Sequence, residues 1–167
     1  LNLNLEKNQS SLRPTAVARF IMDFSQIAQK AGGVVRLRKD GLTAVFGIYV
    51  VAENDVIQAL LAAHQIAQTC QTVLDNSIIP IQIAVSYDHV SIAQVRDGVG
   101  DQVRVSGDDF EQAEALAVNT PLQRIYVTSK VYRAAAHYFS FQPTVEQPTV
   151  EQPTVEQPVA EETFWEL

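Results

Sequence analysis

Residues 32–47, GGVVRLRKDGLTAVFG, decide the fold that we predict for this chain. The two glycines predict the end of a helix, because glycine enters left-handed backbone conformations at little cost. The runs VVRLR and LTAVF predict two strands, and Lys39-Asp40-Gly41 predicts the turn of a β-hairpin between them. Asp40 is either an ordinary turn residue or a metal- or phosphate-binding carboxylate, and this stretch alone favours the turn residue.

The sequence on either side of this hairpin alternates between strand and helix patterns. Leu1, Leu3 and Leu5 alternate with asparagines, which predicts a half-buried strand, and apolar residues at helical spacing predict a helix over about 14–31. After the hairpin we expect a helix capped by Asn54 or Asp55, and then strands at 78–85 and 90–95 joined by a turn at 86–89. An exposed arm or long hairpin is expected at 96–106, followed by a helix from Gly107 to about Val118. The last elements expected before the tail are a strand at 124–128, a helix at 129–136 and a strand at 138–141.

This order of elements predicts an α+β fold. Strands and helices that alternate as β-α-β-β-α-β form a ferredoxin-like core, in which helices pack on a mostly antiparallel sheet. We therefore expect a sandwich of one such sheet and its helices.

The charge of the chain is concentrated in its tail. The formal net charge is −7, but six Glu and no Lys or Arg follow Pro143, which leaves 13 acidic and 12 basic residues in 1–142. No basic stripe with interleaved aromatic residues is present, so nucleic acid is not an expected partner. No apolar run reaches transmembrane length and no signal peptide pattern opens the sequence, so we expect a cytoplasmic protein with no membrane segment in this chain.

The tail itself has a different composition from the rest of the chain. TVEQP occurs at 144–148, 149–153 and 154–158, and proline at every fifth residue is incompatible with a regular helix or a central strand. The final TFWEL holds Trp165, the single Trp, and is either a last strand at the sheet edge or a free hydrophobic anchor for a partner. We predict a domain at 1–142, an extended or disordered linker at 143–161 and an apolar segment at 162–167.

Metal and nucleophile motifs are weak. The three histidines, His64, His89 and His137, fall in different predicted elements, and the single cysteine, Cys70, lies in a helical pattern where a buried structural thiol is expected. The acidic residues at 97–109 lack the spacing of a calcium loop. We therefore expect no cofactor and no metal, unless Asp40 binds one.

Four stretches together resemble the catalytic domain of class III adenylate and guanylate cyclases. They are GGVVRLRKDGLTAVFG, the Ala-rich helix after it, IPIQIAVSYDHVSIAQV and GDDFEQAEAL, and the resemblance covers about residues 1–142. It implies the cyclase fold and active sites that form at a dimer interface. It also implies two divalent metals held by two aspartates, a Lys and an Asp that read the base, and an Asn and an Arg that orient the ribose and stabilise the transition state.

The resemblance places these functional positions on residues that mostly differ from the family pattern. The second metal-binding Asp falls on Asp40 and is retained. The first falls on Asn4, or on Asn2 because the register of the short opening strand is open. The remaining positions are Arg36 for the base-reading Lys, Gln102 for the base-reading Asp, Glu111 for the ribose-orienting Asn and Ala115 for the transition-state Arg.

These substitutions predict a degenerate domain without catalysis. Loss of one group that stabilises a transition state commonly costs 10²–10³ in rate, and several are lost here. We expect a pseudo-cyclase that acts in dimerisation, regulation or protein interaction within signalling. Two alternatives remain: a nucleotide-binding regulatory domain without turnover, and the degenerate half of a heterodimeric cyclase. The expected partner is a second copy or another cyclase-like domain, bound through the 96–106 arm.

Overall fold

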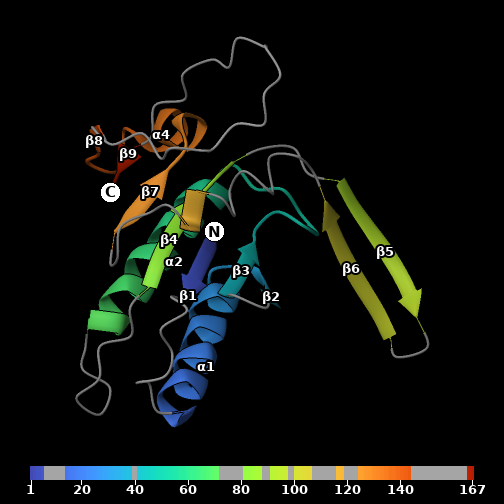
Figure 1. Cartoon of the computed structure of the whole chain (residues 1–167). Coiled ribbons are helices and arrows are strands. Elements are labelled where there is room, and N and C mark those ends of the chain that lie inside the picture. The colour runs from blue at the N-terminus through green and yellow to red at the C-terminus, as the bar shows by residue number, and fades with distance from the viewer. Residues whose placement is uncertain are drawn as a thin grey trace, which may run out of the picture.

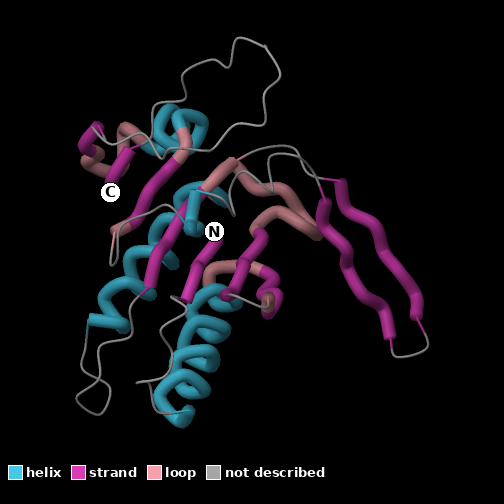
Figure 2. Tube along the Cα trace, viewed as in Figure 1, coloured by secondary structure: helices cyan, strands magenta, loops and turns pink. Residues whose placement is uncertain are grey.

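The computed structural model describes residues 1–5, 14–38, 41–71, 81–87, 91–97, 100–106, 116–118, 124–143 and 165–167 (Figures 1 and 2). A short helical segment lies at 116–118. The named helices and strands are, in chain order, β1 (Asn2–Leu5), α1 (Pro14–Lys30), β2 (Val34–Leu37), β3 (Gly41–Val45), α2 (Asp55–Gln71), β4 (Ile81–Val85), β5 (Ser91–Asp97), β6 (Gly100–Ser106), β7 (Ile125–Val127), α4 (Ser129–Ala135), β8 (Gln142–Pro143) and β9 (Trp165–Glu166).

Seven of these strands form the main sheet, in the order β2-β3-β1-β4-β7-β9-β8. Neighbouring strands are antiparallel except β4 and β7, which pair in parallel. The first four strands have the order β2-β3-β1-β4, which is the order of a ferredoxin-like core when a helix follows β1 and another follows β3. The predicted α+β sandwich with a mostly antiparallel sheet is therefore confirmed.

One face of the main sheet carries the hydrophobic core, and we call it the helix face. Leu3, Leu42 and Ile83 lie opposite one another on adjacent strands and are fully buried. They belong to the same core cluster as Phe20 and Phe24 of α1 and residues of α2 and α4. Because side chains alternate along a strand, the intervening residues of β1, β3 and β4 lie on the opposite face.

The glycine pair after α1 ends that helix, as the sequence predicts. Gly32 has a φ of 89°, its N–H donates to the carbonyl of Gln29 at 3.0 Å, and the N–H of Gly33 donates to the carbonyl of Ala28 at 2.8 Å. These two bonds form a Schellman motif. A Cβ at Gly33 would lie 2.9 Å from Cζ of Phe46 and 3.1 Å from the carbonyl oxygen of Ala28, so a larger residue there would require these neighbours to shift. The β2–β3 hairpin then follows in the predicted place.

The loop between β3 and α2 is fixed at both ends and apolar at its tip. At its start, Gly47 has a φ of 74°, and a Cβ there would lie 2.9 Å from Oδ2 of Asp55. The same oxygen accepts a hydrogen bond from the N–H of Ala52 at 2.8 Å. Between these anchors, three consecutive apolar side chains are 73–81 % exposed: Tyr49, Val50 and Val51.

Strands β5 and β6 form a separate two-stranded sheet, which we call the arm. The sequence predicts strands at 78–85 and 90–95 joined by a turn at 86–89, and an exposed arm or long hairpin at 96–106. The structure has paired strands at 91–97 and 100–106, and residues 88–90 of the predicted turn region lie outside the described residues. Both edges of β4 are occupied, by β1 on one side and β7 on the other, so β5 pairs with β6 and not with β4. Figure 1 shows the arm standing away from the main sheet.

The end of the chain also differs from the prediction in one element. The sequence predicts a strand at 138–141, but the N–H groups of Tyr138 and Phe139 donate back to the carbonyl of Ala135, which continues the turn of α4. Phe141 packs edge-on against Tyr132 of α4, with ring centroids 5.5 Å apart. The strand β8 therefore starts only at Gln142. It pairs with β9, which also pairs with β7.

Candidate functional site

The face of the sheet opposite the helix face carries a row of residues that are mostly polar. In strand register, Arg36 lies opposite Thr43, Thr43 opposite Asn2, Asn2 opposite Ala84, and Ala84 opposite Tyr126. A second row places Gly41 opposite Asn4, and Asn4 opposite Gln82. We call the part of this face formed by β1, β2, β3 and β4 the polar face.

The register of β1 distinguishes the two asparagines that the sequence offers for the first metal position. Asn4 lies opposite Gly41, the residue that follows Asp40. Asn2 lies opposite Thr43, two residues further from that turn. Asp40 itself is outside the described residues. The backbone of Asn4, and not that of Asn2, is therefore next to the turn that carries Asp40.

Asn2 has a structural hydrogen bond. Its Oδ1 accepts from Oγ1 of Thr43 at 2.8 Å, and the two residues are 2 % and 1 % exposed. A buried polar group that lacks a partner costs about 1–3 kcal/mol, so this pair stabilises the strand register of β1 and β3. Sequence analysis did not find the pair. The available signal was a polar residue at the second position of an otherwise apolar run, LTAVF.

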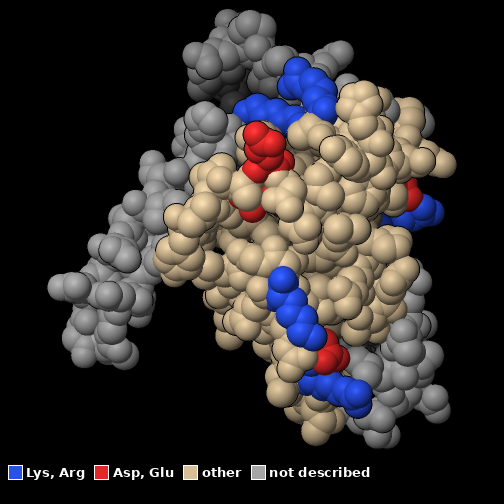
Figure 3. All heavy atoms as spheres, turned by 180° about the vertical axis from the view of Figure 1, so that it is seen from behind, with Lys and Arg blue, Asp and Glu red and all other residues tan. Residues whose placement is uncertain are grey.

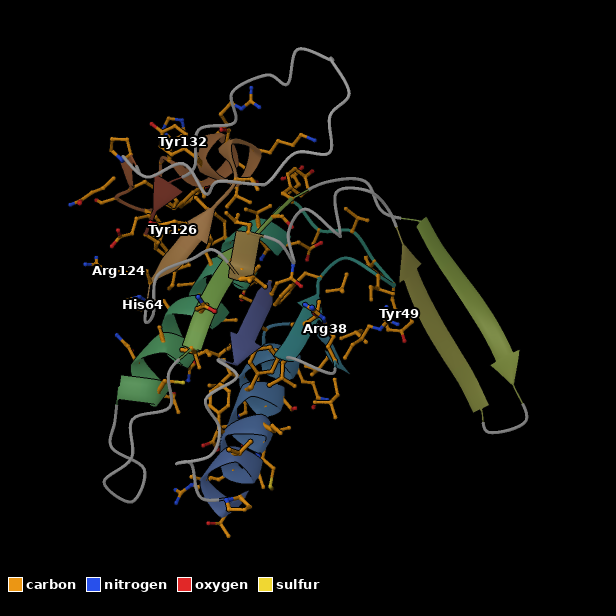
Figure 4. The ribbon with its side chains drawn as sticks, in the orientation of Figure 1. Arg38, Tyr49, His64, Arg124, Tyr126 and Tyr132 are labelled. Atoms are coloured by element: carbon orange, nitrogen blue, oxygen red, sulfur yellow. The ribbon has the colours of Figure 1, made fainter. Side chains whose placement is uncertain are left out.

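Arg36 lies on the polar face in β2 and is half-buried. Arg38, which the sequence analysis did not select, is two residues closer to the turn, and its N–H donates to the carbonyl of Gly41 at 2.8 Å. Figure 4 shows Arg38 at the side of the sheet nearer the arm, together with Tyr49. Arg36 of β2 and Arg38, which directly follows β2, thus lie on the polar face, and β3 separates them from the strand that carries Asn4.

Gln102 lies in the arm, in β6, opposite Val95. Arg36 lies in the main sheet, and these two candidate base-reading positions share no strand pairing. Figure 1 shows the arm apart from β2. In the described part of a single chain, the strand pairing therefore does not bring these two positions together.

The helical segment at 116–118 lies over the same face of the sheet as Asn2. Leu116 and Ala117 are buried in a small cluster with Ala84 and Tyr126, separate from the main core. The side-chain amide of Gln82 donates to the carbonyl of Val118 at 3.0 Å. The predicted site positions Glu111 and Ala115 are outside the described residues, and Ala115 immediately precedes this segment.

The described residues do not hold a metal cluster: among them, no group of three or more His, Cys, Asp or Glu side chains could hold a metal ion. Cys70 is 1 % exposed, as predicted for a structural thiol; its burial, and after it the Asp23 carboxylate, raise the pKa of the thiol to about 12. His64 is exposed and shares a hydrogen bond with Gln68 on the next turn of α2.

Solved structures with the same fold are nucleotide cyclase domains. The guanylate cyclase domain of RhGC from Catenaria anguillulae, in complex with GTP, has a TM-score of 0.78 and 18 % identity and covers 99 % of this chain and 93 % of its own. The fold is that of a nucleotide cyclase catalytic domain. A dimeric guanylyl cyclase domain of the RhoGC fusion protein from Blastocladiella emersonii has a TM-score of 0.79 and 14 % identity, with 99 % and 92 % of the two chains covered.

The similarity extends to bacterial adenylyl cyclases. CyaB from P. aeruginosa has a TM-score of 0.75 at 12 % identity and covers 99 % of this chain and 90 % of its own. No protein-family profile and no curated protein sequence matches the chain. The cyclase fold is thus shared over nearly the whole chain at low identity, in agreement with the fold that the sequence resemblance implies. None of the helices that the structure describes has the length and apolarity needed to cross a bilayer.

Proposed function

We propose that this chain is a catalytically inactive cyclase-like domain that acts in dimerisation, regulation or protein interaction within a signalling protein. The main support is the register of β1. Asn4 lies opposite Gly41, beside the turn that carries Asp40, so a neutral amide occupies the strand position where the cyclase resemblance places the first metal-binding carboxylate. One carboxylate is therefore present where two are needed.

The residues at this position do not fit a two-metal centre. Hard divalent cations such as Mg²⁺ prefer carboxylate oxygens, and an amide oxygen is a much weaker ligand. The family chemistry needs two such cations to activate the nucleophile and neutralise phosphate charge. The substitutions at Glu111 and Ala115 act in the same direction, because the first adds a negative charge and the second removes a cation. We derive no catalytic step through bound metals.

The arm supports the role in dimerisation. A two-stranded ribbon is marginally stable in water on its own, so it needs a surface to pack against. In strand register Ile92 lies opposite Val105, and Gln94 lies opposite Val103. We infer that the ribbon packs on a second copy or on another cyclase-like domain. Sedimentation analysis at high concentration tests this, and a chain that remains monomeric would contradict it.

Nucleotide titration tests the proposed loss of catalysis. Calorimetric titration of the chain with ATP or GTP in the presence of Mn²⁺ is expected to give no heat at millimolar nucleotide, and no cyclic nucleotide is expected as product. Formation of cyclic nucleotide by the purified chain would overturn the proposal.

A restored variant sharpens this test. Asn4→Asp combined with Glu111→Asn and Ala115→Arg returns the family groups to three positions, and we expect it to gain Mn²⁺-dependent nucleotide binding. Asn2→Asp with the same two changes is the matched control. It should gain no binding, because the register places residue 2 away from the turn that carries Asp40. Equal gains in both variants would show that the assignment of Asn4 is wrong.

Nucleotide binding without turnover is the second candidate function. It is favoured by two retained features, the carboxylate of Asp40 and a cation, Arg36, on the polar face. Saturable binding heat without product would favour this candidate. Product that forms only after addition of an active cyclase domain with its own metal-binding carboxylates would instead favour the degenerate half of a heterodimeric cyclase.

A further inference from the structure

The end of the main sheet farthest from β2 holds the last residues of the sequence. Trp165 and Glu166 lie opposite Val127 and Tyr126 of β7 on one side and opposite Pro143 and Gln142 of β8 on the other. Figure 4 shows Arg124 and Tyr126 at this end, away from Arg38 and Tyr49. We call the place that β9 occupies the strand slot, and it is formed by Arg124, β7 and β8.

The strand slot recognises its occupant through three kinds of contact. The backbone of β7 pairs with β9 and, beyond it, the carbonyl of Ile125 accepts a hydrogen bond from the N–H of Leu167 at 3.1 Å. The guanidinium of Arg124 forms an ion pair with the carboxylate of Glu166. Leu167 is partly buried and packs against the main core. The slot thus fits a strand that carries an acidic residue followed by an apolar one.

These contacts hold β9 weakly compared with the central strands of the sheet. β9 has two residues, whereas β1 and β4 have four and five. The Arg124 side chain is 58 % exposed, and exposed ion pairs add little to stability. Segments with so few buried contacts open locally at a much lower free energy than global unfolding. In the described part of the chain, β8 has β9 as its one strand partner, so the opening of β9 removes the pairing of both strands.

The connection between β8 and β9 is far longer than their pairing requires. Residues 144–164 separate the two strands, which is 21 residues, and 15 of these are the three TVEQP repeats. Hairpin loops between adjacent antiparallel strands usually have about 2–5 residues. A connection of this length can span at most about 70 Å, whereas neighbouring strands lie about 4.8 Å apart. The same segment can therefore reach the slot of a neighbouring molecule.

We propose that the strand slot takes β9 of a second copy of this chain, so that two copies are joined by reciprocal exchange of their last strands. Every contact of β9 is kept in the exchanged dimer, and a long connection lowers the effective concentration of the chain's own strand at its slot. The TVEQP repeats supply the necessary length. This exchange is separate from the dimerisation through the arm, which involves different strands.

Charge reversal in two full-length chains tests the exchange. In Arg124→Glu, the slot repels its own Glu166, and in Glu166→Arg, the slot repels its own last strand. When the two variants are mixed, exchange forms two ion pairs of opposite charge. Arg124 of the Glu166→Arg chain meets Glu166 of the Arg124→Glu chain, and the two introduced residues, which also have opposite charges, meet each other. Native mass spectrometry of an equal mixture, with one chain isotope-labelled, should show heterodimers in about tenfold excess over each homodimer, against twofold for random pairing. The excess should fall toward twofold in 1 M salt.

Two controls separate exchange from other causes of dimerisation. The chain with both Arg124→Glu and Glu166→Arg, mixed with the natural sequence, should give less than twofold excess, because exchange then creates like-charge pairs. Deletion of residues 144–158 from both charge variants leaves six residues, enough for a hairpin loop but too few to reach a partner, and should return the ratio to twofold. A ratio of two in the undeleted mixture overturns the exchange even where dimers form through the arm. Monomers alone would overturn both proposals.

Discussion

Leu3 and Asn2 are neighbours on β1 that lie on opposite faces of the sheet, and different interactions stabilise the two faces. Leu3 is fully buried on the helix face with Phe20 and Phe24. Asn2 is also buried, and its side-chain oxygen accepts a hydrogen bond from the hydroxyl of Thr43. The helix face is stabilised by many non-directional contacts, whereas the polar face requires specific partners at specific positions.

This difference explains how a chain can keep a fold and change its site. At 12–18 % identity to the cyclase domains, the helix face can exchange one apolar residue for another of similar volume and still pack. The polar face offers no such substitution, because replacement of a carboxylate by an amide alters its chemistry at once. The fold similarity therefore says little about the site, and the site has to be read residue by residue.

Charged side chains are sparse on part of the outer surface. Figure 3, which views the molecule from behind, shows few of them among the described residues on that side. The sequence of α2 contains one charged residue, Asp55, in 17 residues. That carboxylate accepts the hydrogen bond that fixes the preceding loop, so even the one charge of α2 has a local structural role.

The largest expected effect is on the helix face. Phe24→Ala should lower the free energy of unfolding by about 3–5 kcal/mol, because it removes a fully buried aromatic side chain and leaves a cavity. Met22→Ala, two residues away on the same helix, is the matched control, since Met22 is 63 % exposed and should change stability by less than about 0.5 kcal/mol. Urea denaturation measures both, and equal effects would contradict the assignment of this face as the core.

A smaller effect is expected on the polar face. Asn2→Ala should cost about 1–3 kcal/mol of unfolding free energy, because it leaves the buried hydroxyl of Thr43 without its acceptor. The double variant with Thr43→Val removes both polar groups and should recover part of this loss. A double-mutant cycle in urea measures the coupling. Additive losses would show that the two side chains do not depend on each other.

Cys70 gives a pH-dependent prediction. Its pKa is raised to about 12 in the folded chain, above the unfolded value of 9.0, so the folded state holds the proton more tightly. The resulting stabilisation is fully present below pH 9 and decreases as the pH rises from 9 toward 12. At pH 10 the natural chain should have lost about 1.4 kcal/mol relative to pH 8, in excess of any change in Cys70→Ala.

Thiol chemistry provides the independent check on that residue. A disulfide reagent at pH 8 should leave the native chain unmodified and react with one thiol per chain in denaturant. Rapid modification of the native chain would mean that the helix face opens at Cys70.

The smallest effect is expected at the edge of the sheet. Glu166→Gln removes the ion pair with Arg124, which is 58 % exposed, and should change the global free energy of unfolding by less than about 0.5 kcal/mol. Hydrogen exchange of the Leu167 amide should nevertheless become faster, since local opening of β9 is what the pair opposes. A loss of several kcal/mol would show that β9 belongs to the cooperative core.

The elements with strong local signals could be predicted from the sequence, and those set by distant strands could not. The glycine pair at 32–33 and the apolar alternation of 34–37 and 41–45 determine a helix end and a hairpin through contacts within a few residues. The partner of β5 depends on β1 and β7 occupying both edges of β4, which no local pattern contains. The aromatic run at 138–141 has strand propensity, yet its amides bond back to α4.

The residues of the candidate site divide in the same way, into those that a local sequence pattern indicates and those that only the strand pairing brings together. The resemblance indicated the opening strand and Arg36, whereas the pairing of Asn4 with Gly41 and of Asn2 with Thr43 is known only from the register of β1 against β3. Thr43, Arg38 and Gln82 were missed because each is an ordinary polar residue until the sheet brings it beside the others. The lone polar residue at the second position of LTAVF and of IQIAV was the one signal that could have found two of them, Thr43 and Gln82.

The central position of β1 also has a consequence during synthesis of the chain. β1 pairs with β3 and with β4, so the strand made earliest in this sequence completes its pairing only when Ile81–Val85 has been made. At translation rates of about 5–20 residues per second, that interval is roughly 4–16 s. During it, a strand with alternating leucines has an unpaired edge that chaperones and other nascent chains can reach, and we expect the order of synthesis to affect the folding yield of this domain.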